Sequence, residues 1–262
     1  MHSLLNNIRT RKPLVHCITN YVTANDCANL LLAGGAVPVM ADAPEDAAEI
    51  TSAAQALVLN LGTLSRSRLQ AMLLAGKAAN LCGIPVVLDP VGVWAASFRY
   101  GAAKQLLHEV QFAAVRGNLQ EIDTVLTIVC GSHCMPEAEP PAVCHPRTLA
   151  ALAHTKVICT GAEDIVTDGE TVFRCRNGHP ILRQITGAGC MLSALTGAFL
   201  AAENSVESCA AAVCAMGLAG ELAASRMTPR DGNASCRTYL IDAVYNMTDE
   251  QLEEGAKLEH LT

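Results

Sequence analysis

The chain has 262 residues, of which 51% are hydrophobic and 3% aromatic, so it can bury a large aliphatic core. Its net charge of −7 and the absence of a Lys or Arg block in the sequence argue against nucleic acid or an anionic membrane as partners. No apolar run approaches about 18–20 residues, and the basic start is not followed by a signal-peptide pattern, so we expect a cytoplasmic protein without a membrane span.

The first half of the chain alternates strand-like and helix-like segments. Residues 14–18 predict a strand, and Asn20 or Thr23 can cap a helix that two glycines stop after residue 33. Ser65 can cap a later helix that reaches residue 81. The other elements expected here are an extended segment at 37–40, a short acidic helix opened by Pro44, strands at 56–60 and 84–88, a helix to about 110 and a strand at 113–115.

The second half follows the same pattern with one interruption. Residues 130–146 are rich in proline and predict an inserted loop, whereas Asp168-Gly169 between two β-forming runs at 165–173 predicts a hairpin. The remaining expected elements are a helix at 147–154, a strand at 157–159 and helices at 190–202, 206–225 and about 235–246. This alternation, without a repeat or a shift in composition, predicts a single α/β domain over residues 1–262, with a mainly parallel central sheet and helices on both faces.

Twelve cysteines are scattered through the chain, mostly in apolar stretches where a reduced thiol behaves as a small hydrophobe. One group differs because it combines cysteine with histidine in a proline-containing segment. These residue types could bind zinc, but their spacing is not a standard one, which favours a surface loop. The group consists of Cys130, His133, Cys134, Cys144 and His145.

Small and polar residues follow the predicted strands. Ligands of parallel α/β sheets bind beyond the carboxyl ends of the strands, so these residues are expected to meet at one edge. Asn20, Asn60 and Ser65 can each be explained singly as caps, but the whole set at one edge indicates a site. The set comprises Thr19, Asn20, Met40, Asn60, Gly62, Thr63, Asp89, Pro90, Arg116, Gly117, Asn118, Thr160 and Gly161.

The segment at 184–194 predicts an anion-binding turn. Gly187 and Gly189 allow the main chain to approach a ligand closely, and a helix beginning near Cys190 would direct its unpaired N–H groups at that ligand. Cys190 would stand at the mouth of the turn, where the helix dipole favours its thiolate. A plain turn into a packed helix accounts for the glycines equally well. The sequence contains no P-loop motif and no complete dinucleotide fingerprint.

Several motifs together resemble the hydroxyethylthiazole kinase family, over residues from about 12 to about 247. The resemblance implies a ribokinase-like fold, a homotrimer with active sites between subunits, and transfer of phosphate from Mg-ATP to 4-methyl-5-(2-hydroxyethyl)thiazole in thiamine biosynthesis or salvage. The motifs are Thr186-Gly187-Ala188-Gly189-Cys190, Asp89-Pro90-Val91-Gly92, Arg116-Gly117-Asn118 with Glu121, Pro13-Leu14-Val15-His16-Cys17-Ile18-Thr19-Asn20 and Val166-Thr167-Asp168-Gly169.

The resemblance also implies roles for individual residues. Asn20, Met40 and Gly187 would contact the thiazole, with Asn20 and Met40 completing the pocket of a neighbouring subunit. Arg116, Asn118 and Thr160 would contact ATP, and Asp89 and Glu121 would lie around Mg²⁺. Gly187, Ala188, Gly189 and Cys190 would form the catalytic turn, in which Cys190 takes the place of the base aspartate of most ribokinase-like enzymes. The sequence also departs from the family pattern. Ala188 stands where Thr is usual and Ala162 where Glu is common, and the segments Val93-Trp94-Ala95 and 130–146 differ from the usual sequence.

The expected chemistry depends on positioning and charge stabilisation more than on covalent help. The N–H groups of the turn would hold the transferring phosphoryl group, Mg²⁺ would neutralise its oxygens, and Arg116 would bind the nucleotide phosphates. Cys190 could accept the hydroxyl proton or only orient the alcohol. The plain alternatives are a surface ion pair for Arg116 and a solvated helix position for Glu121.

Two other classes of protein stay open at this point. A hydroxymethylpyrimidine kinase, or a repair dehydratase for hydrated nicotinamide nucleotides, would share the turn but more often carries Asp where Cys190 stands. A non-catalytic ligand-binding or metal-sensing protein would rest on the group of cysteines and histidines at 130–145.

Overall fold

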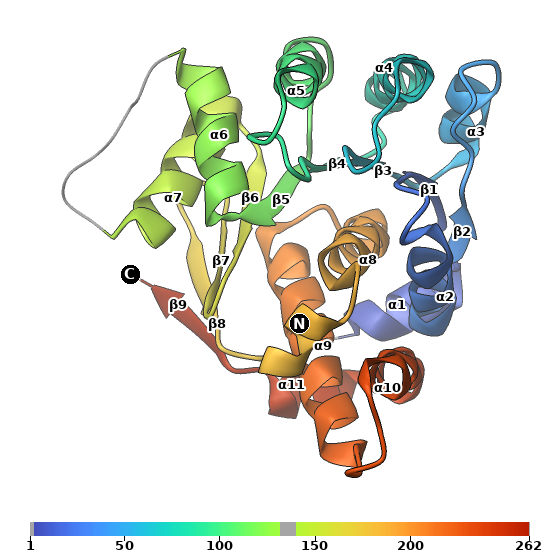
Figure 1. The fold of residues 1–262 in the computed structure, drawn as a ribbon, viewed down its shortest axis with the longest axis vertical. Helices are drawn as coiled ribbons and strands as arrows, with labels where there is room; N and C mark the ends of the chain where they lie inside the picture. Colours follow the sequence, from blue (N-terminus) through green and yellow to red (C-terminus); the bar gives the residue numbers. More distant parts are fainter. Residues whose placement is uncertain (1–2, 132–139, 262) are drawn as a thin grey trace.

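The described residues of this computed structural model, 3–131 and 140–261, form an α/β structure around a nine-stranded sheet (Figure 1). The strand order is β2-β1-β3-β4-β5-β6-β7-β8-β9. Neighbours from β2 through β6 pair in parallel, and those from β6 through β9 pair antiparallel, which confirms the mainly parallel fold. The strands are β1 Leu14–Ile18, β2 Val37–Val39, β3 Ala56–Asn60, β4 Val86–Asp89, β5 Ala114–Asn118, β6 Lys156–Thr160, β7 Asp164–Thr167, β8 Val172–Cys175 and β9 Leu258–Leu261.

Helices cover both faces of the sheet, which is why the central strands are apolar on both sides. Along β3, Val58 packs into the cluster that contains α8 and α9, whereas Leu57 and Leu59 pack into the cluster on the opposite face. Figure 1 shows α3 to α7 on one face and α1, α2, α8, α9 and α10 on the other. The helices are α1 Leu4–Arg11, α2 Ala24–Gly34, α3 Ala47–Ala53, α4 Arg66–Leu81, α5 Ser97–Glu109, α6 Leu119–Cys130, α7 Pro141–Ala153, the 3₁₀ turn η1 Pro180–Gln184, α8 Ala188–Ala202, α9 Val206–Arg226, α10 Asn233–Asn246 and α11 Asp249–Gly255.

Local signals in the sequence located several elements correctly. Ser65 Oγ accepts a hydrogen bond from Arg68 N at 3.1 Å and caps α4 as predicted. The antiparallel pair β7 and β8 turns through Gly169, whose φ of 101° is the left-handed conformation expected for the Asp168-Gly169 hairpin. Helices α1, α6 and α11 and strand β9 were not among the predicted elements.

The predicted loop at 130–146 is wrong over its second part. Residues from Pro141 onward are helical, with Pro141 in the first turn of α7, where its missing N–H costs nothing. Of the proposed metal-binding group, His133 and Cys134 lie outside the described residues. The buried His145 ring contacts the Asp123 carboxylate through Nδ1. Within 3–131 and 140–261, no group of three or more His, Cys, Asp or Glu side chains is placed to hold a metal.

Helix α9 corrects the expectation that no segment is long and apolar enough to cross a membrane. Its 21 residues pass that test of length and composition, with a hydropathy of 1.4 over the qualifying window. However, 72% of that window is buried inside the protein, and a core helix passes the same test. Its alanines and Cys209 pack in the cluster shared with α8.

Candidate active site

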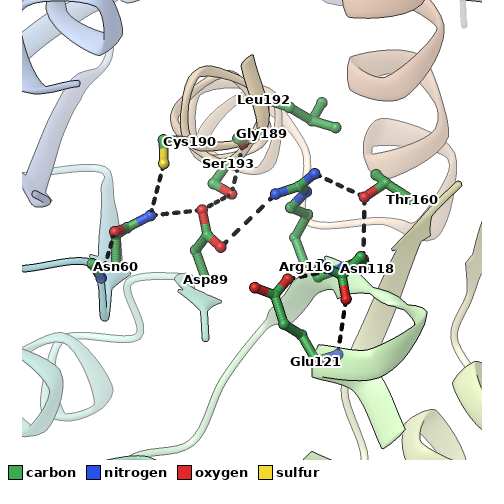
Figure 2. A network of polar contacts seen from close by, with 12 residues as sticks. Asn60, Asp89, Arg116, Asn118, Glu121, Thr160, Gly189, Cys190, Leu192 and Ser193 are labelled. Carbon is green, nitrogen blue, oxygen red and sulfur yellow. Dashed lines mark hydrogen bonds and ion pairs between the residues drawn. The ribbon is translucent and has the colours of Figure 1, made fainter. Parts of the chain in front are cut away.

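Parallel pairing aligns the carboxyl ends of the central strands and brings their polar residues together. Asn60 of β3 stands in register with Asp89 of β4, and Asn118 of β5 stands in register with Thr160 of β6. Asn20 follows β1, and its Nδ2 donates to Asn60 Oδ1 at 3.1 Å. Residues from five separate parts of the sequence therefore meet at this edge, where helix α8 begins (Figure 2).

The turn before α8 has the geometry of an anion-binding site. Gly187 is the N-cap with a φ of 82°, and a Cβ there would overlap Thr23, so only glycine fits. The helix begins at Ala188, two residues earlier than predicted. The N–H of Ala188 donates to Ile185 O at 3.3 Å, and the first intrahelical bond runs from Met191 N to Gly187 O at 2.8 Å. The N–H groups between them are those of a first helical turn, which have no intrahelical partner and suit an anion.

Asp89 is a fully buried carboxylate at the centre of the site. Its Oδ2 accepts hydrogen bonds from Asn60 Nδ2 and Ser193 Oγ, both at 2.7 Å. Its Oδ1 accepts no hydrogen bond from the described residues and lies 3.8 Å from Arg116 Nη1. Burial raises the pKa of Asp89 from 3.8 to about 6, and the nearby charge of Glu121 adds to this, while Arg116 opposes it. Oδ1 therefore has unused capacity to bind a cation or to accept a proton.

Arg116 connects Asp89 to the next strand. Its Nη2 donates to Thr160 Oγ1 at 2.8 Å, and its side chain is 12% exposed. A Cβ at Gly189 would overlap the guanidinium, so Arg116 lies directly against the first turn of α8. The alternative of a surface ion pair is wrong, because this guanidinium lies between the turn and the strand ends and is largely shielded from solvent (Figure 2).

Glu121 forms a capping box at the start of α6. Its backbone N–H donates to Asn118 Oδ1 at 3.0 Å, and its Oε2 accepts from Asn118 N at 2.9 Å. Its Oε1 accepts from Gly92 N at 3.0 Å, which ties the loop after β4 to the end of β5. Glu121 is only 7% exposed, so the alternative of a solvated helix position is wrong.

Cys190 lies in the first turn of α8, beside Asp89. Its Sγ accepts hydrogen bonds from the Nδ2 atoms of Asn20 and Asn60, each at 3.3 Å. The predicted thiolate is not supported, because burial, followed by the charge of Asp89, raises the pKa of the Cys190 thiol. The hydrogen bonds from Thr23, Asn60 and Asn20 oppose this shift without reversing it. Desolvation and a like charge thus favour the neutral thiol.

A cavity of about 730 Å³ opens on the other side of the turn. It brings together the three residues expected to contact ATP, Arg116, Asn118 and Thr160, with Gly187 and the first residues of α8. Met40 is not part of its lining; it follows the edge strand β2 and packs against the core. The other walls are Gly161, Ala162, Asp164, Arg176, Asn177, Gly178, His179, Pro180, Leu182, Arg183, Ile185, Leu192, Val213, Met216 and Gly217.

Sequence reasoning missed several contributors to this site. Ser193 and Asn60 both bind the Asp89 carboxylate, but Ser193 was unnoticed, and Asn60 was placed at the edge of the site without a role of its own. Asn60 had a usable signal, because it ends a buried strand next to the one that ends in Asp89. Val213 and Met216 of α9 had none, since apolar residues of a core helix are not distinguished from cavity walls by their sequence.

A protein family, several relatives and several solved structures are similar to this chain over most of its length. A sequence model described as the Hydroxyethylthiazole kinase family matches residues 5–250. A hydroxyethylthiazole kinase of Methanosphaerula palustris is 48% identical over 261 residues, covering 98% of this chain and 97% of the relative. The solved structure of a hydroxyethylthiazole kinase protein from Pyrococcus horikoshii OT3 is 37% identical, with a TM-score of 0.91 over 99% of this chain and 98% of that one. A ribokinase-like superfamily protein from Enterococcus faecalis V583 is similar in fold alone, with 12% identity and a TM-score of 0.61 over 88% of this chain and 87% of that one.

Proposed function

The chain belongs to the hydroxyethylthiazole kinase family, and from this membership we infer that it phosphorylates hydroxyethylthiazole in thiamine biosynthesis or salvage. The acceptor is the hydroxyl group of 4-methyl-5-(2-hydroxyethyl)thiazole, and ATP is the donor. The observation that carries this assignment within the structure is the convergence of Arg116, Thr160 and the first turn of α8 on one cavity of about 730 Å³. A nucleotide cavity that ends at a helix N-terminus suits the transfer of a phosphoryl group.

The nucleotide phosphates would bind against the first turn of α8. The N–H groups of Gly189 and Cys190 would stabilise the charge of the transferring group, and Arg116 would contact the same oxygens from the opposite side. The fixed fork of Arg116 donors suits phosphate, and its Nε has no hydrogen-bond partner within the described residues. Asn118 and Thr160 would contact the nucleotide from the strand ends.

The carboxylates of Asp89 and Glu121 fit a magnesium ion. Mg²⁺ in kinases is held by one or two carboxylates together with substrate phosphates, and it neutralises charge on the phosphate oxygens. Asp89 offers a buried Oδ1 to which no described residue donates a hydrogen bond. Burial raises the pKa of Asp89, and the nearby charge of Glu121 raises it further. Both oxygens of Glu121 already accept backbone N–H groups, so Asp89 would be the principal protein ligand.

Cys190 would orient the alcohol next to the phosphoryl group. Because the pKa of its thiol is raised by burial and by the charge of Asp89, the neutral form dominates at neutral pH, and a neutral thiol is a weak base. A neutral thiol also avoids placing a second negative charge beside the incoming phosphate. Asn20 and Gly187, on either side of Cys190, would contact the substrate.

A homotrimer would complete the thiazole pocket with Asn20 and Met40 of a neighbouring subunit, as the resemblance implies. The surface near these residues supports a subunit contact, because Tyr21 is 75% exposed, Val22 55% and Val37 41%. Strand β2, which carries Val37, is an edge of the sheet with one unpaired side among the described strands. The enzyme is proposed to work in the cytoplasm.

The test is a direct product assay. Purified protein, ATP, MgCl₂ and hydroxyethylthiazole should yield the thiazole phosphate, detected by mass spectrometry. Hydroxymethylpyrimidine in place of the thiazole tests the closest alternative kinase. Folded wild-type protein that makes no phosphate ester from the thiazole would overturn the assignment.

A further inference from the structure

Asn60 is buried, 1% exposed, and ends strand β3 beside Asp89. Its Oδ1 accepts from Gly62 N at 2.9 Å, which is the local turn bond expected of an asparagine after a strand. That bond engages only the oxygen of the amide. The Nδ2 group is directed away from the turn, toward two side chains of the candidate active site (Figure 2).

The orientation of this amide is fixed by its surroundings. Oδ1 accepts from Gly62 N and also from Asn20 Nδ2, so a reversed amide would set its NH₂ group against two donors. The reversed oxygen would face the Asp89 carboxylate. A buried polar group left without a partner destabilises the folded protein, so the reversed orientation is disfavoured. Gly62 allows this approach, since a Cβ there would come within 2.9 Å of Asn60 Oδ1.

The two hydrogens of Nδ2 reach one acceptor each. Nδ2 lies 2.7 Å from Asp89 Oδ2 and 3.3 Å from Cys190 Sγ. We propose that Asn60 is a positioning residue for phosphoryl transfer, which holds the Asp89 carboxylate and the Cys190 sulfur in one fixed arrangement at the N-terminus of α8. The inference rests on the proposed function of the site and assigns Asn60 no contact with the substrate.

The consequence for Cys190 follows from the properties of a thiol. Sulfur accepts hydrogen bonds weakly and has a single hydrogen to donate. The amides of Asn20 and Asn60 both donate to the sulfur, so its own hydrogen is directed away from them. Without Asn60 the thiol loses one of these two amide donors. Of the two hydrogen bonds that the described residues donate to Asp89, the one from Ser193 is kept, together with the ion pair to Arg116.

A double-mutant cycle separates this role from a structural one. Asn60→Ala should lower kcat about 10–100-fold and change KM less than about threefold, since groups that hold active residues act on the reaction more than on binding. In a Cys190→Ala background the same substitution should cost at least about fivefold less, because one of its two targets is gone. Ser193→Ala is the matched control: Ser193 binds the same Asp89 oxygen but does not bind Cys190, so its cost should be equal in both backgrounds.

Two results would overturn the inference. The first is an equal cost of Asn60→Ala in both backgrounds, which would reduce Asn60 to a support for Asp89. The second comes from Asn60→Asp, which keeps the size and the oxygen that accepts from Gly62, and so remains informative if the alanine variant does not fold. It places an oxygen against Asp89 and Cys190, and a kcat near that of the wild type would refute the need for the amide. Wild-type protein that makes no thiazole phosphate would refute the proposed function instead.

Discussion

Asp89→Asn should make the protein more stable at pH 8 while it reduces kinase activity. Burial raises the pKa of Asp89 from 3.8 to about 6, so the folded protein binds this proton more tightly than the unfolded chain does. Stability from this group is therefore complete below about pH 4, falls as the pH rises, and is at its lowest above about pH 6. This rise in the pKa of Asp89 corresponds to a loss of about 3 kcal/mol in the free energy of unfolding above pH 6.

The substitution removes the cost of burying the charge of Asp89, but it also removes the ionic partner of Arg116. Arg116 Nη1 loses the carboxylate 3.8 Å away and keeps its bond to Thr160. We therefore expect a net gain of about 1–3 kcal/mol at pH 8 and no gain at pH 4.5. Activity should fall at least about 100-fold, because the proposed principal ligand of the Mg²⁺ that would neutralise the phosphate oxygens is lost.

The assay is urea unfolding followed by circular dichroism at pH 4.5 and pH 8, in EDTA and without nucleotide, at one protein concentration. At each pH the free energy of unfolding of the wild type is subtracted from that of the variant. The informative quantity is how this difference changes between the two pH values, since the titration of other groups cancels. Glu45→Gln, which removes a charge from the surface, should show no such change. An equal stability difference at both pH values for Asp89→Asn would refute the reasoning about its burial.

Three further outcomes are expected. Cys190→Asp should retain or improve kcat, and Cys190→Ala should lose clearly less than the ~10²–10⁴-fold typical of acid–base catalysis; an inactive Asp variant beside a fully active Ala variant would contradict the role given to this residue. Gly187→Ala should lower the free energy of unfolding by at least ~1 kcal/mol, because the φ of 82° at this position and the contact with Thr23 exclude a Cβ. A melting temperature equal to that of the wild type would argue against this. Light scattering should give the mass of a trimer, and Val37→Lys at the exposed edge strand should reduce that mass; an active wild-type monomer would exclude the shared pocket.

Local patterns determined much of the fold. Continuous apolar runs located the parallel strands, and the Asp168-Gly169 turn located the hairpin, because such signals depend on a few neighbouring residues. Helices α6 and α11 show where attention to caps would have helped, since Asn118 with Glu121 and Thr248 with Gln251 each form a capping box. Strand β9 gave no such signal; its four residues become a strand by pairing with β8.

The sequence by itself determined which residues stand at the ends of the strands and which glycines stand at the start of α8. Only the tertiary structure decided how they are joined. Asn60 and Cys190 are 130 positions apart, and the register of β3 with β4 under α8 brings them to 3.3 Å. The tertiary structure also decided in which direction the pKa of Cys190 is shifted. The helix N-terminus visible in the sequence favours a thiolate, but burial and the charge of Asp89 raise the pKa of the thiol. Desolvation and charge pairing depend on what surrounds a group in space, and neighbours along the chain do not specify it.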